Sequence, residues 1–292
     1  MNWLLFRWAW LLESPLFVGT TPVRSLNRCR LYVPARALWA ALTAELARRK
    51  TSEFPSYQSA GKQLQEEARF TYLYPAEQIG DPWRAWLPRY EEGNGLIWRR
   101  EDQQAANAFL ALRQIRMRLL TTRPSTAIDP SCETAVEGTL RESECVNTHW
   151  HSEDGAMGSR VAMVGYVFLR DGSNMRSDLE GIASIMVGGD TRYGFGRLRR
   201  IALTQEQAVF GAQVELGDQD PIVCSEIVYA HATGAENLVG SREMLVGWDN
   251  AGGRGLFAQN TDPLWVPGAT VAGGEFTCKW KVEQNGLWVK VQ

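Results

Sequence analysis

The sequence predicts an α+β fold, and the observations behind this are two strand-helix-strand passages followed by a β-rich region. The first passage runs from an alternating apolar strand at 3–12, through an Ala- and Leu-rich helix at 34–50, to a strand that contains Phe70. The second runs from 161–170, which is apolar on both faces, through a short helix to a strand at 197–203. Two such units indicate a ferredoxin-like, RRM-type core.

The segments between the two passages are less regular. After a polar connector at 51–61, we predict a loop region rich in Pro, Gly and Trp at 75–95, a helix at 101–113 and an amphipathic strand at 115–119. The stretch at 121–158 has no sustained periodicity, and we predict that it is a long insertion rather than a core element.

Short strands and Gly/Pro turns follow Thr204 and make the last part of the chain β-rich. The final hairpin is expected to pair an alternating run at 275–280 with 287–291. These patterns divide the chain into a core at 1–204, which contains the insertion, and a β-rich C-terminal extension or second subdomain at 205–292.

Composition limits the class of protein. The 292 residues are 45% hydrophobic, which supplies enough apolar material for one large or two small cores. The net charge of −2 creates no protein-wide basic field, so a site for a polyanion must be a local patch. Five irregularly spaced cysteines fit a reducing cytoplasm. No apolar run approaches the length of a membrane span, and Arg7 and Glu13 interrupt the apolar opening, which argues against a signal peptide.

A glycine-rich stretch at 188–197, Gly-Gly-Asp-Thr-Arg-Tyr-Gly-Phe-Gly-Arg, is the strongest candidate for a binding site. Its spacing differs from G-x-G-x-x-G, and no Gly-Lys-Ser/Thr follows, so a nucleotide cofactor is not indicated. A capping-box pattern at 177–180 predicts a helix that runs to Met186, which puts the stretch at a helix-to-strand junction with free backbone N–H groups. A tight turn without a ligand is the alternative, and four nearby arginines favour RNA.

Residues 187–197 resemble the glycine-rich loop of the RAMP superfamily, the CRISPR-associated proteins that hold guide RNA. That loop has the pattern G-h-G-x-x-x-x-x-G-x-G and follows the last helix of an RRM-like fold. Two further passages agree with the resemblance. Ile-Asp-Pro at 128–130, followed by Thr-Ala-Val-Glu-Gly-Thr-Leu at 134–140, is similar to a segment of type III effector subunits. The passages at 14–19 and 32–34 together resemble the amino-terminal entry of these subunits.

Departures from the family pattern indicate which member the chain resembles. Backbone subunits that cut target RNA carry an aspartate in the loop after the first strand, and 14–32 contains none. Residues 33–40 also replace the family's usual segment after that loop, so its contacts are not carried over. With the β-rich extension, these departures favour the Cas-five-type subunit that caps the five-prime handle of the guide. A Cas-seven-type backbone subunit is the alternative.

The resemblance implies a non-catalytic, cytoplasmic subunit of a type III effector, with no cofactor and no membrane contact. Its expected partners are guide RNA and the backbone and large subunits, with target RNA a partner only indirectly. Arginines and backbone N–H groups would hold phosphates, an aromatic ring would stack on a base, and splayed nucleotides at the insertion would provide specificity. The predicted RNA-binding residues are Gly188, Gly189, Thr191, Arg192, Tyr193, Gly194, Phe195, Gly196, Arg197, Arg24 and Arg28.

Clustered cysteines and histidines in the insertion leave other chemistry open. Cys132, Cys145, His149 and His151 could bind zinc, although their C-x12-C-x3-H-x-H spacing fits no compact zinc motif. His149 or His151 could instead act as a general acid or base in an endoribonuclease, as in the Cas-six-type processing nucleases of the same superfamily. A surface role for both histidines is the simplest interpretation. Cleavage of target RNA by a backbone subunit is the remaining enzymatic alternative.

Overall fold

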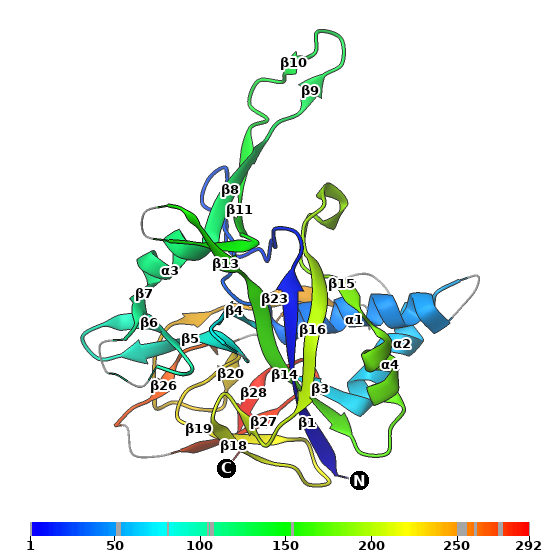
Figure 1. The fold of residues 1–292 in the computed structure, drawn as a ribbon, viewed down its shortest axis with the longest axis vertical. Coiled ribbons are helices and arrows are strands. Elements are labelled where there is room, and N and C mark those ends of the chain that lie inside the picture. Colours follow the sequence, from blue (N-terminus) through cyan, green and yellow to red (C-terminus); the bar gives the residue numbers. More distant parts are fainter. Residues whose placement is uncertain are drawn as a thin grey trace.

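The structure, a computed structural model, describes residues 2–291 except 51–53, 81, 104, 106–107, 153–154, 250–255, 260–261 and 274–276. It is a mixed fold of helices and many more strands, as the sequence predicts (Figure 1). None of the helices within this part of the chain combines the length and the apolar character needed to cross a membrane.

Strand β1 (Trp3–Leu12) lies in the interior of the larger sheet, between β14 (Ala162–Arg170) and β16 (Arg197–Gln205), and is antiparallel to both. The strands predicted at 3–12, 161–170 and 197–203 are confirmed. Both faces of β1 are covered. Phe6 packs under Arg176 of a helix, whereas Trp3, on the opposite face, donates to the carbonyl of Gln219 in the C-terminal region at 2.6 Å.

The strand order of this sheet is β15-β16-β1-β14-β4-β5-β6-β7, and β3 also pairs with β14. The loop region predicted at 75–95 is wrong, because an antiparallel meander of β4, β5 and β6 occupies it. Its Pro and Gly residues indicate turns, yet Ala85, Trp86 and Leu87 are buried in β5. The further strands of the sheet are β15 (Ser184–Met186), β3 (Ala68–Phe70), β4 (Tyr74–Gln78), β5 (Trp83–Glu91), β6 (Gly95–Arg100) and β7 (Leu110–Ala111).

Helices α1 (Ala35–Lys50), α2 (Tyr57–Glu67) and α4 (Met175–Gly181) lie together beside β15 and β16 (Figure 1). The predicted helix at 34–50 is confirmed by α1. Most of the described part of the predicted connector belongs to α2 instead, because Ser56 caps the helix through Ser59 and Leu64 is buried. Residues 51–53 of that connector lie outside the described residues.

Helix α3 (Leu112–Leu119) occupies the segment predicted as a strand at 115–119. Ile115 and Leu119 are the buried residues of α3, and their spacing of four places them on one helical face. The helix predicted at 101–113 is wrong over most of its length, since its described residues form turns after Arg100 and then β7, and only 112 and 113 are helical, at the start of α3. Residues 104, 106 and 107 of that prediction lie outside the described part. The sequence prediction failed here because the alternation of Ile115, Met117 and Leu119 with arginines fits the period of a strand, whereas Ile115 and Leu119 also fit the period of a helix.

The glycine-rich loop connects two antiparallel strands, β15 and β16, rather than a helix and a strand. Helix α4 begins after Asn174 and ends at Gly181, so Ser177 lies inside the helix and donates to the carbonyl of Asn174 at 2.9 Å. The expected capping box is therefore wrong, and the apolar residues that follow form β15.

The insertion forms an arm that stands out from one end of the molecule (Figure 1). Strands β8 and β11 pair antiparallel over its lower part, and β2 joins β11 at the base. Most side chains of the arm are exposed, as its lack of a buried stripe in the sequence indicates. The strands of the insertion and its base are β2 (Leu26–Asn27), β8 (Leu120–Ser125), β9 (Ile128–Asp129), β10 (Thr134–Ala135), β11 (Arg141–Val146), β12 (His149–His151) and β13 (Met157–Arg160).

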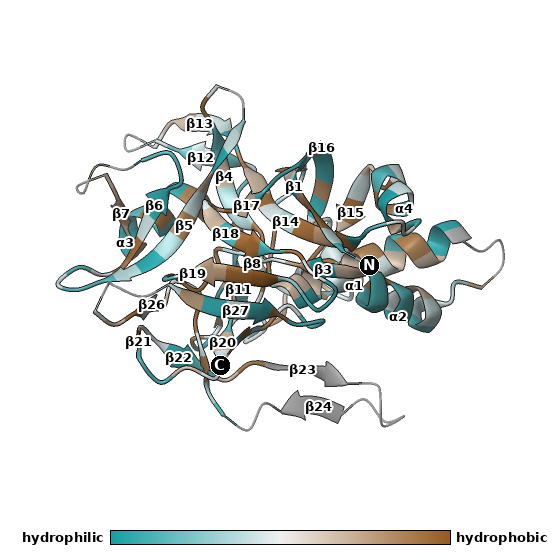
Figure 2. Ribbon diagram, turned by 90° about the horizontal axis from the view of Figure 1, so that it is seen from below, coloured by the Kyte–Doolittle hydropathy of each residue, from teal (hydrophilic) through white to brown (hydrophobic). Residues whose placement is uncertain are grey.

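The region after β16 is β-rich and packs on the larger sheet. In its last hairpin, Trp280 lies opposite Lys290 and Val282 opposite Trp288, so the predicted pairing is confirmed, although 275 and 276 lie outside the described residues. One hydrophobic cluster spans both regions, and hydrophobic colour is concentrated in central strands such as β14 and β19 (Figure 2). The strands are β17 (Ala208–Val209), β18 (Ala212–Glu215), β19 (Ile222–Ser225), β20 (Ala232–Thr233), β21 (Leu238–Val239), β22 (Arg242–Glu243), β23 (Val246–Asp249), β24 (Leu256–Gln259), β25 (Leu264–Trp265), β26 (Thr270–Val271), β27 (Cys278–Val282) and β28 (Trp288–Lys290).

Candidate nucleic-acid interface

Two glycines of the loop permit a close approach of backbone to backbone. A Cβ on Gly196 would lie 1.9 Å from the carbonyl oxygen of Val187, and one on Gly188 would lie 2.2 Å from that of Phe17. Both residues have positive φ, which only glycine adopts without strain. Gly194 has the same backbone conformation but faces open space. The glycines therefore shape the loop and fasten it to residues 14–17.

Backbone N–H groups that were expected to be free are used inside the protein. The N–H of Gly189 donates to the Phe17 carbonyl at 2.9 Å, and that of Gly196 donates to the Pro15 carbonyl at 2.7 Å. The N–H of Gly194 bonds to Thr191 within the loop, and that of Arg197 bonds to the Ser14 hydroxyl. These four donors are unavailable to a ligand, so binding by this loop would rest more on its exposed side chains than the sequence predicts.

The most prominent side chains of the loop are Arg192 and Tyr193, which lie on a 3₁₀ turn, η1 (Thr191–Tyr193). Tyr193 is 70% exposed, and Arg192 is exposed and forms no ion pair with the described residues. Phe195 and Thr191, by contrast, are half-buried. An exposed cation next to an exposed ring suits a phosphate and its attached base.

The other three arginines near the loop have partners. Glu13 accepts from Arg197 at 3.1 Å and from Arg199 at 2.7 Å, and Arg197 remains 62% exposed. Arg200 donates to carbonyls at the end of α4 and is a structural residue. Because exposed ion pairs of this kind are weak, a phosphate could replace Glu13 on Arg197.

The arm and the basic loop after β1 meet the glycine-rich loop at the same end of the molecule (Figure 1). The guanidinium of Arg141, on β11, lies 5.6 Å from the centre of the Tyr193 ring, a cation–π contact. Leu26, between Arg24 and Arg28, pairs with the same strand. We call Arg24, Arg28, Arg141, Arg192, Tyr193 and Arg197 the cationic mouth. Sequence reasoning missed Arg141 because no local pattern indicates which part of the arm reaches the loop.

The two clustered histidines lie on β12 with their side chains on one face of the strand, since the buried Trp150 separates them. His149 contacts the Thr148 hydroxyl at 3.1 Å, and His151 accepts from the Asn147 amide at 2.7 Å. Among the described residues, no carboxylate forms a hydrogen bond with either ring. The described residues therefore supply two imidazoles, but they lack the carboxylate that orients a histidine general base in many hydrolases.

The structure does not bring together the four residues considered for zinc. Cys145 is buried at the base of the arm opposite Thr121, whereas Cys132 is exposed beyond β9 and bonds to Thr134. Burial raises the pKa of Cys145, which disfavours the thiolate that zinc requires. The described residues contain no group of three or more His, Cys, Asp or Glu side chains that could hold a metal ion.

A buried polar chain, which the sequence did not reveal, links the C-terminal region to the core. His231 contacts the Tyr72 hydroxyl at 2.7 Å and Glu243 at 2.5 Å, and Arg30 pairs with the same carboxylate and with Tyr32. Burial lowers the pKa of His231 and outweighs the opposite effect of Glu243. Burial alone would raise the pKa of Glu243, but hydrogen bonds from His231 and Arg30 lower it to about 2. These hydrogen bonds fix the side chain of Arg30 inside the protein.

No protein-family model and no curated protein matches the sequence. The fold does resemble solved structures. One is a chain in the cryo-EM structure of the type III-B Cmr-beta bound to cognate target RNA and AMPPnP, with a TM-score of 0.53 and 14% identity over 91% of this chain and 85% of that chain. A chain of Cmr-beta bound to cognate target RNA gives a TM-score of 0.54 and 13% identity over 91% and 86%. This chain shares their fold.

Proposed function

We propose that this chain is a non-catalytic, guide-RNA-binding subunit of a type III CRISPR effector that holds the five-prime repeat handle. The observation that carries the proposal is the cationic mouth, in which the exposed Tyr193, next to the exposed Arg192, contacts Arg141 of the arm. The fold shared with Cmr-beta over 91% of the chain supports it. The backbone and large subunits of the effector would be its protein partners, and target RNA would reach it only through them.

The topology also supports a RAMP-type core. Along the chain, the four strands of this core are β1, β3, β14 and β16. Their order in the sheet is β16-β1-β14-β3, so the fourth strand lies beside the first and the first beside the third. Helix α1 follows the first strand and α4 follows the third. A ferredoxin-like, RRM-type core has this arrangement of strands and helices. We propose that residues 1–204 form this core and that 205–292 is the extension expected of a Cas-five-like capping subunit.

Binding would rely on side chains more than on the glycines. Arg192 and Arg197, with Arg24 and Arg28 nearby, would hold phosphates, and a base would stack on the exposed ring of Tyr193. Arg141 would keep that ring in place or take the opposite face of the base. Phosphate contacts bind RNA regardless of sequence, so the arm would provide any preference for particular nucleotides.

The test is binding of labelled CRISPR repeat RNA to an Arg192→Ala, Arg197→Ala variant across a salt series. We expect affinity to fall about tenfold and the dependence of log K on log salt to weaken by about one unit per lost phosphate contact. The matched control is Arg48→Ala, Lys62→Ala, which removes two exposed cations from α1 and α2. Equal affinity of the double variant and the wild type would contradict the proposal.

An endoribonuclease is the second candidate, favoured by one observation. His149 lies opposite Arg160 in the hairpin of β12 and β13, and the Arg160 side chain donates to the Leu12 carbonyl at the end of β1. This hairpin therefore borders the segment at 14–17 that holds the glycine-rich loop. If this function is correct, pure protein will shorten repeat RNA on a denaturing gel, and His149→Ala or His151→Ala will abolish the cut. Intact RNA after prolonged incubation excludes guide processing by these histidines.

A further inference from the structure

The outer face of α3 carries a groove of about 650 Å³ that lies outside the cationic mouth. Met117 is 66% exposed and Leu112 is also exposed, although both are apolar. Large apolar side chains that share an open groove are a common sign of a contact surface. The residues that line the groove are Leu112, Arg113, Arg116, Met117, Leu120 and Glu144.

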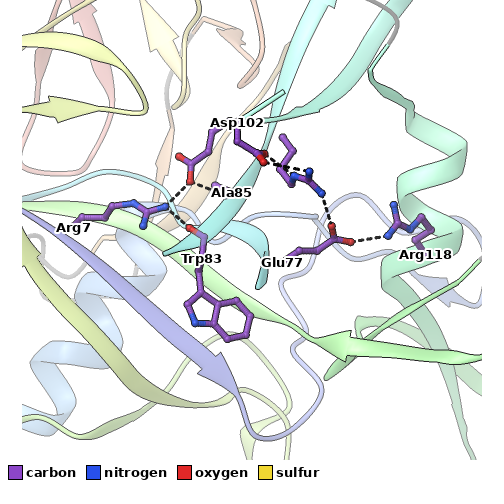
Figure 3. A network of polar contacts seen from close by, with 8 residues as sticks. Arg7, Glu77, Trp83, Ala85, Asp102 and Arg118 are labelled. Atoms are coloured by element: carbon purple, nitrogen blue, oxygen red, sulfur yellow. Dashed lines mark hydrogen bonds and ion pairs between the residues drawn. The ribbon is translucent and has the colours of Figure 1, made fainter. Parts of the chain in front are cut away.

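The opposite face of α3 is held firmly, so the groove is formed before any partner arrives. Arg118 donates to Glu77 at 2.6 Å, and Glu77 also accepts from Arg100, which ties the helix to β4 and β6 (Figure 3). The Arg118 guanidinium also lies 5.4 Å from the centre of the Trp150 ring. A rigid site loses little conformational entropy on binding, which favours association.

The charges in the groove are unequal. Arg116 donates to both carboxylate oxygens of Glu144 at 2.6 and 2.7 Å, and Glu144 also accepts from the Cys29 N–H at 3.0 Å. That arginine is therefore neutralised by a fixed partner. Arg113 is exposed and has no ion pair with the described residues. Of the described residues that line the groove, Arg113 is therefore the one free cation, and it lies beside an apolar floor.

We propose that this groove binds a segment of a partner protein that places an apolar side chain between Leu112, Met117 and Leu120 and a carboxylate on Arg113. Protein is favoured over RNA because none of the described residues that line the groove is aromatic, so no ring is present for base stacking. The flexible thioether of Met117 adapts to different apolar side chains. The proposal does not depend on RNA binding, because its residues are separate from the cationic mouth.

The test uses two immobilised libraries of nonapeptides and the full-length protein. In the first library, one Leu, Met, Phe or Trp stands among Glu, Asp and Ser, and in the second, Lys and Arg replace the acidic residues. We expect the wild type to be retained by the acidic library only. The best acidic peptide, measured in solution by fluorescence anisotropy, should bind Met117→Asp at least about tenfold more weakly, because a charge then enters the apolar floor.

Arg113→Glu reverses the charge requirement and supplies the sharper test. This variant should lose the acidic peptide and retain members of the basic library, whereas Lys62→Glu, an equal charge change on α2, should behave like the wild type. Both groove variants should keep wild-type affinity for repeat RNA, so a failure of this proposal is distinct from a failure of RNA binding. Equal retention by the two libraries, or acidic-peptide binding unaffected by Met117→Asp and Arg113→Glu, would overturn it, as would displacement of the peptide by repeat RNA.

Discussion

Gly196 and Gly194 share a left-handed backbone but differ in their surroundings, and this difference predicts different costs of substitution. Gly194→Ala should cost about 1 kcal/mol of stability, because only the backbone conformation is unfavourable. Gly196→Ala should cost more than about 3 kcal/mol, since its Cβ would also displace the Val187 carbonyl. Urea unfolding followed by circular dichroism measures both. Similar losses for the two variants would mean that the contact with Val187 does not fix the loop.

At the scale of elements, the arm carries little of the stability. Its residues between Ser125 and Arg141 are mostly exposed, and the hydroxyls of Thr126 and Thr139, 2.9 Å apart, make their other hydrogen bonds within the arm. Replacing 126–140 with Asn-Gly, a two-residue hairpin turn, should leave the melting temperature within about 3 °C of the wild type. If the arm contacts guide RNA as proposed, the same deletion weakens repeat-RNA binding. A large drop in melting temperature would show that the arm packs against the body.

At the scale of the whole molecule, His231 makes stability depend on pH. Burial lowers its pKa from the ordinary 6.5, so below that pH the unfolded chain binds a proton that the folded protein does not. The contribution of neutral His231 to the free energy of unfolding is fully present above pH 6.5 and is lost as the pH falls below it. We expect the free energy of unfolding to fall as the pH is lowered from 7 to 5. Glu243, with a pKa of about 2, loses its contribution only below its ordinary 4.5, outside this window.

The control for this pH dependence is His231→Gln, which removes the titrating group and should flatten the slope whatever its effect on absolute stability. His149 and His151 remain in that variant, and both are partly exposed. An unchanged slope in His231→Gln would assign the pH dependence to another group and would contradict the role of the buried chain.

Long apolar segments could be predicted from the sequence, and elements defined by contacts between distant residues could not. Residues 3–12 and 161–170 form strands because apolar residues occupy most positions and no proline breaks either segment. By contrast, 115–119 satisfies both a strand and a helix period, and burial of Ile115 and Leu119 decides for the helix. The glycine-rich loop was found from composition. Its partners Glu13 and Arg141 were not, because folding alone brings residues so far apart into contact.

The position of β1 between β14 and β16 also affects how the chain is made. Ala162, the first residue of β14, follows Leu12 by 150 residues, and β16 comes later still. At a ribosomal rate of about 5 to 20 residues per second, β1 waits about 8 to 30 s for β14, the earlier of its two neighbours. During that time a strand with three tryptophans has no sheet to join, and such strands associate with other chains. Chaperones that shield residues 3–12 during translation will therefore raise the yield of folded protein more than mutations that stabilise the finished sheet.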